Sequence, residues 1–184
     1  MQGVSLLLKA LKFAADKHQH QRRKNKAASP YINHLIEVAG LLWETGNVRD
    51  LDTIAAGILH DTIEDTDTSP TELETEFGSK ICHIVEEVTD DKRLSKEVRK
   101  QLQIEHAGES SWEARQVKLA DKICNVHDLI DAPPTDWSLQ RRLDYVDWAE
   151  HVIQGLRGTN ALLEQRFDEV CLQVRRHLLD QLSF

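Results

Sequence analysis

The residues of this chain that are best suited to carry out chemistry begin with His60 and Asp61. These two close an apolar stretch of residues 53–59. Glu64 and Asp65 follow at once, so one imidazole and three carboxylates fall within a single short run. Removing a carboxylate from water is costly unless it is paired, and a divalent cation is a common partner. The run therefore predicts a metal-binding cluster at the end of a buried segment.

Two further ligand-type residues stand on predicted helices. His34 falls in the first turn of one helical pattern, and Asp121 falls in the middle of another that covers about residues 113–130. With His60 and Asp61 they offer two imidazoles and two carboxylates, which suit a borderline-to-hard divalent ion such as Mn²⁺, Fe²⁺, Zn²⁺ or Mg²⁺. A lone histidine on an apolar face is more often a hydrogen-bonded core residue, so this prediction depends on the whole set.

The second half of the acidic run favours proton chemistry. If the helical turn continues past His60, Glu64 lies at i+4 from His60 and Asp65 at i+4 from Asp61, so all four side chains share one side of the chain. A carboxylate within reach of the metal site can take up a proton or orient a water, and mutual repulsion can raise the pKa of one of the two. The alternative is a solvated helix end.

A basic stretch, residues 21–26, precedes His34. A run of charges is by default a solvated loop, but Arg23 and Lys24 also suit a clamp for phosphate groups, because Arg offers a planar fork and Lys a point charge. The aromatic residues farther along the chain are interpreted as packing residues rather than base-stacking ones: Trp137, Tyr145 and Trp148.

Helical spacing of apolar residues runs through nearly the whole chain, and no segment shows sustained strand-like alternation. The sequence therefore predicts an all-α fold of roughly eight or more helices in a single domain, residues 1–184. The expected helices cover about residues 4–20, 31–45, 53–61, 70–77, 80–90, 96–106, 113–130, 138–156 and 161–182.

Charge and composition narrow the class of protein. The formal net charge of −8 argues against a nucleic-acid binder, and no apolar run approaches the roughly 18 residues of a membrane span. The start of the chain lacks the features of a signal peptide, and its three cysteines are widely spaced, which predicts reduced thiols in the cytoplasm. The oligomeric state stays open, and a homo-oligomer is compatible with the sequence.

The order and spacing of these ligand-type residues resemble those of the HD-domain metal-dependent phosphohydrolases. The surrounding sequence is most similar to the hydrolase domain of the RelA/SpoT proteins, and above all to the small, hydrolase-only metazoan SpoT homologues of the Mesh1 type. The resemblance covers nearly the whole chain and implies an HD-domain helical bundle. The stretches that carry it are PYINH (30–34), LHDTIEDT (59–66), VEEVTDDK (85–92) and VKLADKICN (117–125).

The resemblance implies a Mn²⁺-dependent (p)ppGpp 3′-pyrophosphohydrolase, which releases pyrophosphate from the 3′ position of guanosine tetra- or pentaphosphate. Such an enzyme degrades the alarmone of the stringent response. One alternative is an NADPH phosphatase or another nucleotide phosphohydrolase of the same metal chemistry. Another is a non-catalytic module that senses a nucleotide, which would predict the loss of a metal ligand or of the acidic pair.

The resemblance also assigns roles to individual residues. The manganese ligands that it implies are His34, His60, Asp61 and Asp121. Glu64 and Asp65 match the catalytic acidic pair of the family. The substrate contacts that it implies are Arg23 beside the base, Lys24 on phosphate and Asn125 on the nucleoside.

Overall fold

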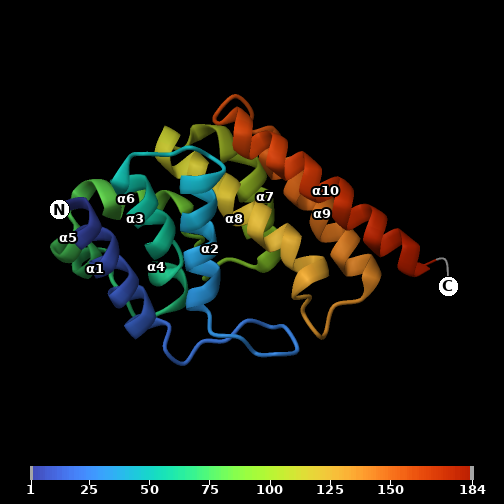
Figure 1. The fold of residues 1–184 in the computed structure, drawn as a ribbon, viewed down its shortest axis with the longest axis horizontal. Helices are drawn as coiled ribbons and strands as arrows, with labels where there is room; N and C mark the ends of the chain where they lie inside the picture. Colours follow the sequence, from blue (N-terminus) through green and yellow to red (C-terminus); the bar gives the residue numbers. More distant parts are fainter. Residues whose placement is uncertain (1, 183–184) are drawn as a thin grey trace.

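The computed structural model describes residues 2–182, so residues 1, 183 and 184 of the predicted 1–184 domain lie outside the described part of the chain. Figure 1 shows packed helices without a sheet, and the predicted all-α fold is confirmed. The helices are α1 (Gln2–Lys17), α2 (Ile32–Glu44), α3 (Leu51–Leu59), α4 (Thr62–Asp65), α5 (Pro70–Phe77), α6 (Ser79–Val88), α7 (Lys96–Glu105), α8 (Trp112–Asp131), α9 (Leu139–Gln154) and α10 (Ala161–Leu182), with a 3₁₀ turn, η1 (Ala107–Glu109), before α8.

Helix α3 is buried on every side after its first turn and lies in the interior. Asp50 caps its N-terminus by accepting a hydrogen bond from the Thr53 backbone N–H, and every residue from Thr53 to Leu59 is buried. The helix packs against α1, α2, α6 and α8. Gly57 permits the close approach of α2, because an added Cβ would come within 2.7 Å of Leu42 Cδ1. The chain therefore leaves α3 at His60 while still deep inside the protein.

Helix α8 is the main axis of the fold. It packs against α10, α2, α3, α6 and α9, and it carries Val117, Ala120 and Val126 without any exposed surface. Ser111 caps its N-terminus by accepting from the Ala114 N–H. Because α2, α3 and α8 contact one another, residues far apart in the sequence meet where the three helices converge.

Two loops lie side by side at one end of these helices, along the lower edge of Figure 1. The segment of residues 18–31 joins α1 to α2, and the segment of residues 132–138 joins α8 to α9. An isolated antiparallel bridge joins Asn25 to Pro134, and the Thr135 N–H donates to the Lys24 carbonyl at 3.0 Å. The basic stretch is therefore a loop, as predicted, but one that is docked on the body of the protein.

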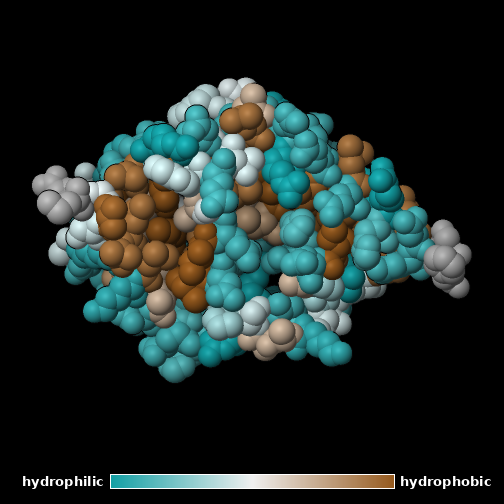
Figure 2. Space-filling model, viewed as in Figure 1, coloured by the Kyte–Doolittle hydropathy of each residue, from teal (hydrophilic) through white to brown (hydrophobic). Residues whose placement is uncertain are grey.

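Apolar and polar side chains occupy different regions of the outer surface. Figure 2 shows an apolar patch over α1, where Val4 and Leu8 are exposed, whereas the surface of the 18–31 loop is mainly polar. Within residues 2–182, no helix has the length and apolar character needed to cross a membrane.

Candidate active site

Three ligand-type side chains converge between α2, α3 and α8. His34 lies in the first turn of α2, His60 directly follows α3, and Asp121 lies in the middle of α8. Asp121 Oδ1 is 3.2 Å from His34 Nε2 and 3.6 Å from His60 Nε2, and one ligand atom of each residue lies within 4.8 Å of the others. The sequence spacing thus becomes a compact cluster, because each residue stands on a helix that contacts the other two.

The two histidines present unpartnered nitrogens inside this cluster. His60 Nδ1 donates to the Gly57 carbonyl at 2.8 Å, which turns the lone pair of Nε2 toward the carboxylates. His60 Nε2 and both ring nitrogens of His34 are buried without a hydrogen-bond partner. Buried polar atoms normally have a partner, and the Nε2 atoms of His34 and His60 lie within 4.0 Å of carboxylate oxygens of Asp61 and Asp121. A divalent cation bound by His34, His60 and Asp121 would satisfy both nitrogens and carboxylate, so the donor set fits such an ion.

Asp61 borders the cluster but lies outside the set of mutually close ligand atoms. Its Oδ2 is 3.1 Å from His60 Nε2 and 3.9 Å from His34 Nε2. The same oxygen accepts a 2.6 Å hydrogen bond from the hydroxyl of Tyr31, which precedes α2. The structure therefore brings three of the four predicted ligands together and holds the fourth beside them through Tyr31.

Buried charges around Asp121 fix its ionisation and orientation. Lys122, only 7% exposed, lies 2.9 Å from Asp121 Oδ2, and the Asn125 side-chain amide donates to Oδ1 at 2.5 Å. Burial opposes ionisation of Asp121, but Lys122 and the two histidines together hold its pKa well below the usual range. The pKa of Asp61 is also lowered against its burial, mainly by His60. Two ionised carboxylates beside two imidazoles are the electrostatic setting of a cation site.

Glu64 and Asp65 line two adjoining cavities that share Tyr31, Asn125 and Tyr145. Glu64 lines a cavity of about 190 Å³ with His60, Asp61 and Asp121. Burial raises the pKa of Glu64 to about 7, although the Asp90 backbone N–H donates to its Oε2 at 3.0 Å. A carboxyl group with this pKa can both give and accept a proton near neutral pH.

Asp65 turns into a neighbouring cavity of about 250 Å³. Its Oδ2 accepts a 2.8 Å hydrogen bond from Gln21 Nε2, and its Oδ1 pairs with Lys92 Nζ. Both oxygens are therefore held, one by a neutral amide and the other by a cation. The helical turn does continue, since the Asp65 N–H donates to the Asp61 carbonyl at 2.8 Å, and Lys92 Nζ approaches both Glu64 and Asp65.

The predicted substrate-contacting residues surround the cavity of about 250 Å³ that Asp65 lines, the second cavity of the site. Arg23 forms an ion pair with Asp128, its Nη2 donates to Asn125 Oδ1 at 3.1 Å, and its guanidinium lies 5.6 Å from the Tyr31 ring centre. Lys24 lines the same cavity and is exposed. Asn125 joins the two regions, because it contacts Arg23 on one side and Asp121 on the other.

The aromatic residues also line the cavities of the site, which the sequence did not indicate. Trp137, Tyr145 and Trp148 pack against the hydrophobic core, as interpreted. In addition, Trp137 and Tyr145 line the second cavity, while Tyr145 and Trp148 line the cavity beside the metal cluster. The two cavities share Tyr31, Tyr145 and Asn125, so a ligand with several groups could reach from one into the other.

Sequence reasoning missed four side chains at the site: Gln21, Tyr31, Lys92 and Lys122. Two of them had a local signal, since Tyr31 precedes His34 by one helical turn and Lys122 adjoins Asp121. Gln21 and Lys92 had none, because each reaches Asp65 from a loop that is distant in sequence.

Comparison with known proteins agrees with this geometry. The HD-domain family matches residues 10–146. The protein named guanosine-3′,5′-bis(diphosphate) 3′-pyrophosphohydrolase MESH1 from Danio rerio is 47% identical over 171 residues, which are 93% of this chain and 95% of that protein. The chain belongs to the HD-domain family and to its MESH1 group. The human protein of the same name is 50% identical over 159 residues, which cover 86% of this HD-domain chain and 89% of the relative.

Two solved structures superpose on this HD-domain protein, and the first supports the same assignment. One, described as a metazoan ortholog of SpoT that hydrolyses ppGpp, superposes with a TM-score of 0.88 at 46% identity, covering 91% of this chain and 94% of the other. A Listeria monocytogenes protein, lmo0812, superposes with a TM-score of 0.64 at 24% identity over 79% of this chain and 95% of its own. The second likeness concerns the fold alone.

Proposed function

We propose that this HD-domain protein hydrolyses guanosine 3′,5′-bis(diphosphate) and its pentaphosphate form at the 3′ position. The reaction consumes one water, releases pyrophosphate and leaves the nucleoside with a free 3′-hydroxyl and its 5′-diphosphate, or its 5′-triphosphate when the substrate is the pentaphosphate. The observation that carries the proposal is the cluster of His34, His60 and Asp121 beside Glu64, in a chain 47% identical to a relative named for this activity.

The cation of this site is proposed to be Mn²⁺, held by His34, His60, Asp61 and Asp121. Asp61 is included because its carboxylate lies 3.1 Å from His60 Nε2, at the edge of the cluster. Imidazole and carboxylate ligands without thiolate suit Mn²⁺ and related ions. When bound, such an ion lowers the pKa of water and offsets negative charge on phosphoryl oxygens.

Glu64 is proposed to move the proton. It lines the cavity of the metal cluster, and a pKa of about 7 leaves both of its protonation states populated at neutral pH. Asp65 is proposed to orient the reacting groups from the neighbouring cavity, where Gln21 and Lys92 fix its two oxygens. The two carboxylates are therefore proposed to act from adjoining cavities of one site.

The second cavity is proposed to hold the nucleoside and its remaining phosphates. Arg23 offers a planar cation beside Tyr31, and Lys24 offers an exposed ammonium at the rim. Asn125 offers amide hydrogen-bonding groups between this cavity and Asp121. NADPH also combines a purine, a ribose phosphate and a diphosphate, so an NADPH phosphatase is the alternative to be tested alongside.

The deciding experiment compares turnover of ppGpp, NADPH and dGTP by the purified protein with Mn²⁺ or Mg²⁺, with products identified by ion-exchange chromatography. We expect pyrophosphate and GDP from ppGpp, activity lost after chelation, and activity restored by Mn²⁺. Turnover of NADPH without turnover of ppGpp would replace the proposed substrate. Full ppGpp hydrolysis in the chelated protein would contradict the metal site.

A further inference from the structure

A series of hydrogen-bonded side chains reaches the site from the end of α1. His18, which is 2% exposed, directly follows α1, and its Nδ1 lies 2.6 Å from Gln21 Oε1. Gln21 Nε2 in turn donates to Asp65 Oδ2 at 2.8 Å. The connection thus runs from a buried imidazole through a neutral amide to one oxygen of the acidic pair.

The chemistry of these side chains decides which atom donates and which accepts in each hydrogen bond of the connection. Gln21 must present its NH₂ group to the Asp65 carboxylate, because an amide oxygen there would face an acceptor. Its Oε1 then needs a donor, so the Nδ1 of His18 carries the proton in this contact. His18 Nε2 is buried without a hydrogen-bond partner, so His18 hydrogen-bonds here through Nδ1 alone. His18 therefore fixes which way the Gln21 amide points, and Gln21 fixes Asp65.

The backbone of this loop has hydrogen bonds of its own. The turn is already closed by the Gln21 N–H, which donates to the His18 carbonyl at 2.9 Å, and the Tyr31 N–H donates to the Gln21 carbonyl at 3.2 Å. The His18 ring stacks on Tyr31 with a centroid distance of 5.1 Å, and the Tyr31 hydroxyl holds Asp61. The side-chain bonds are thus additional to those that set the loop, and they end on the carboxylates of the site.

We infer that His18 and Gln21 are positioning residues for Asp65, with His18 acting through the amide of Gln21 to hold the carboxylate in its working orientation. The inference rests on the proposed function, in which Asp65 orients the reacting groups. Outer hydrogen-bonding partners of functional groups commonly contribute about 10- to 100-fold to affinity or rate. We therefore expect loss of either residue to lower kcat and to leave KM and metal content nearly unchanged.

The test begins with variants that change hydrogen bonding and keep size. Gln21→Met removes the donor to Asp65, and His18→Phe keeps a ring beside Tyr31 but removes Nδ1–H. We expect kcat to fall about tenfold in each, on the nucleotide that the wild-type protein turns over. His18→Asn, whose amide can donate near the position of Nδ1, should recover most of the rate. His20→Phe is the matched control, since His20 is a neighbouring exposed histidine.

A double-mutant cycle separates positioning from a structural role. In an Asp65→Asn background, Gln21→Met should cause no further loss of kcat, because its effect is transmitted through the absent carboxylate. An equal loss in both backgrounds, or a wild-type kcat in Gln21→Met, would overturn the inference. If His18→Phe proves too unstable to purify, Gln21→Met carries the test alone.

Failure of the inference is distinguishable from failure of the proposed function. A slow Asp65→Asn variant beside a wild-type Gln21→Met variant defeats only the positioning role. A wild-type rate in Asp65→Asn removes the proposed role of Asp65 and the inference with it. If no nucleotide is turned over, nitrogen-15 NMR still decides: an exchange-protected His18 Nδ1–H signal in the wild type should be lost in Gln21→Met, and its absence in the wild type would contradict the geometry.

Discussion

The metal cluster and the substrate loop are built in different ways. His34, His60 and Asp121 stand on or beside three helices that contact one another within one hydrophobic core, and the two histidines are almost fully buried. The 18–31 loop instead crosses the surface and is joined to the 132–138 loop by the isolated bridge between Asn25 and Pro134, with its hydrogen bond from the Thr135 N–H to the Lys24 carbonyl. Arg23 and Lys24 depend on this loop for their position.

Because of this difference, we expect the metal cluster to determine the reaction and the loop to determine which substrate is bound. Ligands that are fixed by core helices keep their geometry whether or not a nucleotide is present, because moving one requires repacking of the core. Side chains on a surface loop can change without disturbing that core. We therefore expect variants of the cluster to abolish turnover of every substrate, and variants of the loop to change affinity and selectivity.

The largest effect is expected for the cluster itself. Replacing His60 by Ala or Asp121 by Asn removes a proposed ligand and leaves its partners unsatisfied, so cation binding and turnover should fall together, with kcat reduced on the order of 10³-fold or more. Metal analysis after dialysis and steady-state kinetics give the two readouts. His83→Ala is the control, because His83 is an exposed histidine on α6.

A wild-type turnover number in His60→Ala would refute the metal site. The wild-type protein should also gain thermal stability when Mn²⁺ is added, by about 2.7 kcal/mol at a concentration 100 times the Kd. His60→Ala should lack this gain, whereas Arg23→Met should retain it. Equal stabilisation of all three proteins would mean that the cation binds elsewhere.

A somewhat smaller loss is expected for Glu64→Gln. The amide keeps the shape of the side chain but cannot exchange a proton, and proton transfer by a positioned group contributes about 10²- to 10⁴-fold. We expect kcat to fall by about 10²-fold while metal stoichiometry stays at the wild-type value. A variant that binds metal normally and turns over at the wild-type rate would remove Glu64 from the mechanism and leave the metal site intact.

Glu64 should also make stability depend on pH. Its pKa rises from 4.5 in the unfolded chain to about 7 in the folded protein, chiefly because it is buried. Between these values the unfolded chain loses the proton that the folded protein keeps, so the free energy of unfolding should decrease as the pH rises through this window. Because Glu64→Gln lacks this proton, its free energy of unfolding relative to the wild type should increase by about 2 kcal/mol between pH 4.5 and 7.5.

Urea unfolding of the metal-free proteins at several pH values measures this difference. Lys92 and Arg99, which approach Glu64 to 4.0 and 3.7 Å, should keep the effect below the full linkage value of about 3 kcal/mol. Parallel stability curves for wild type and Glu64→Gln would show that the carboxyl titrates normally in the folded protein.

The same division between core and loop explains what the sequence could predict. Helical periodicity located most of the helices, and His34, His60 and Asp121 were recognisable only as a set of ligand-type residues whose order and spacing resemble those of a known family. The pairing of Lys122 with Asp121 was not assigned, since a lysine on a helix is more often a solvated side chain. The particular cavity that Glu64 or Asp65 lines was not predicted either, because the direction of a side chain at a helix end depends on its tertiary partners.

The loop contacts depend on information that local patterns lack. Gln21 reaches Asp65 across 44 positions of the chain, and Arg23 reaches Asp128 across 105. These distances in sequence are bridged by the packing of α2 against α1 and α8, which places the loop against the body of the protein. A charge run alone therefore indicated that Arg23 and Lys24 could bind phosphate, but it gave no means of identifying their partners.

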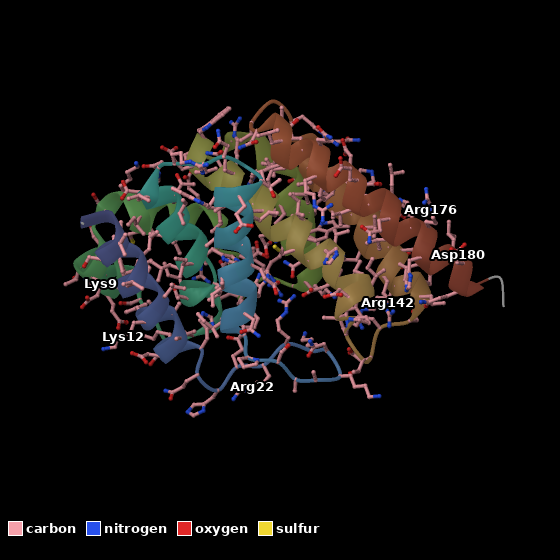
Figure 3. The ribbon with its side chains drawn as sticks, viewed as in Figure 1. Lys9, Lys12, Arg22, Arg142, Arg176 and Asp180 are labelled. Carbon is pink, nitrogen blue, oxygen red and sulfur yellow. The ribbon has the colours of Figure 1, made fainter. Side chains whose placement is uncertain are left out.

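The smallest effect, and the one that tests the loop directly, is expected for Arg23→Met. Arg23 faces the second cavity and pairs with Asp128, whereas Arg22, labelled in Figure 3 at the lower edge of the protein, donates to the carbonyls of its own loop at Gln19 and Gln21. Arg22→Met is thus the matched control, with the same substitution one residue away. We expect Arg23→Met to raise KM about tenfold, or about 1.4 kcal/mol, at nearly unchanged kcat and metal content, and Arg22→Met to leave KM within twofold. If both variants raise KM equally, the general charge of the loop attracts the substrate and Arg23 makes no specific contact with it. If Arg23→Met instead loses metal, metal binding by the cluster depends on the loop, and the two regions are not independent.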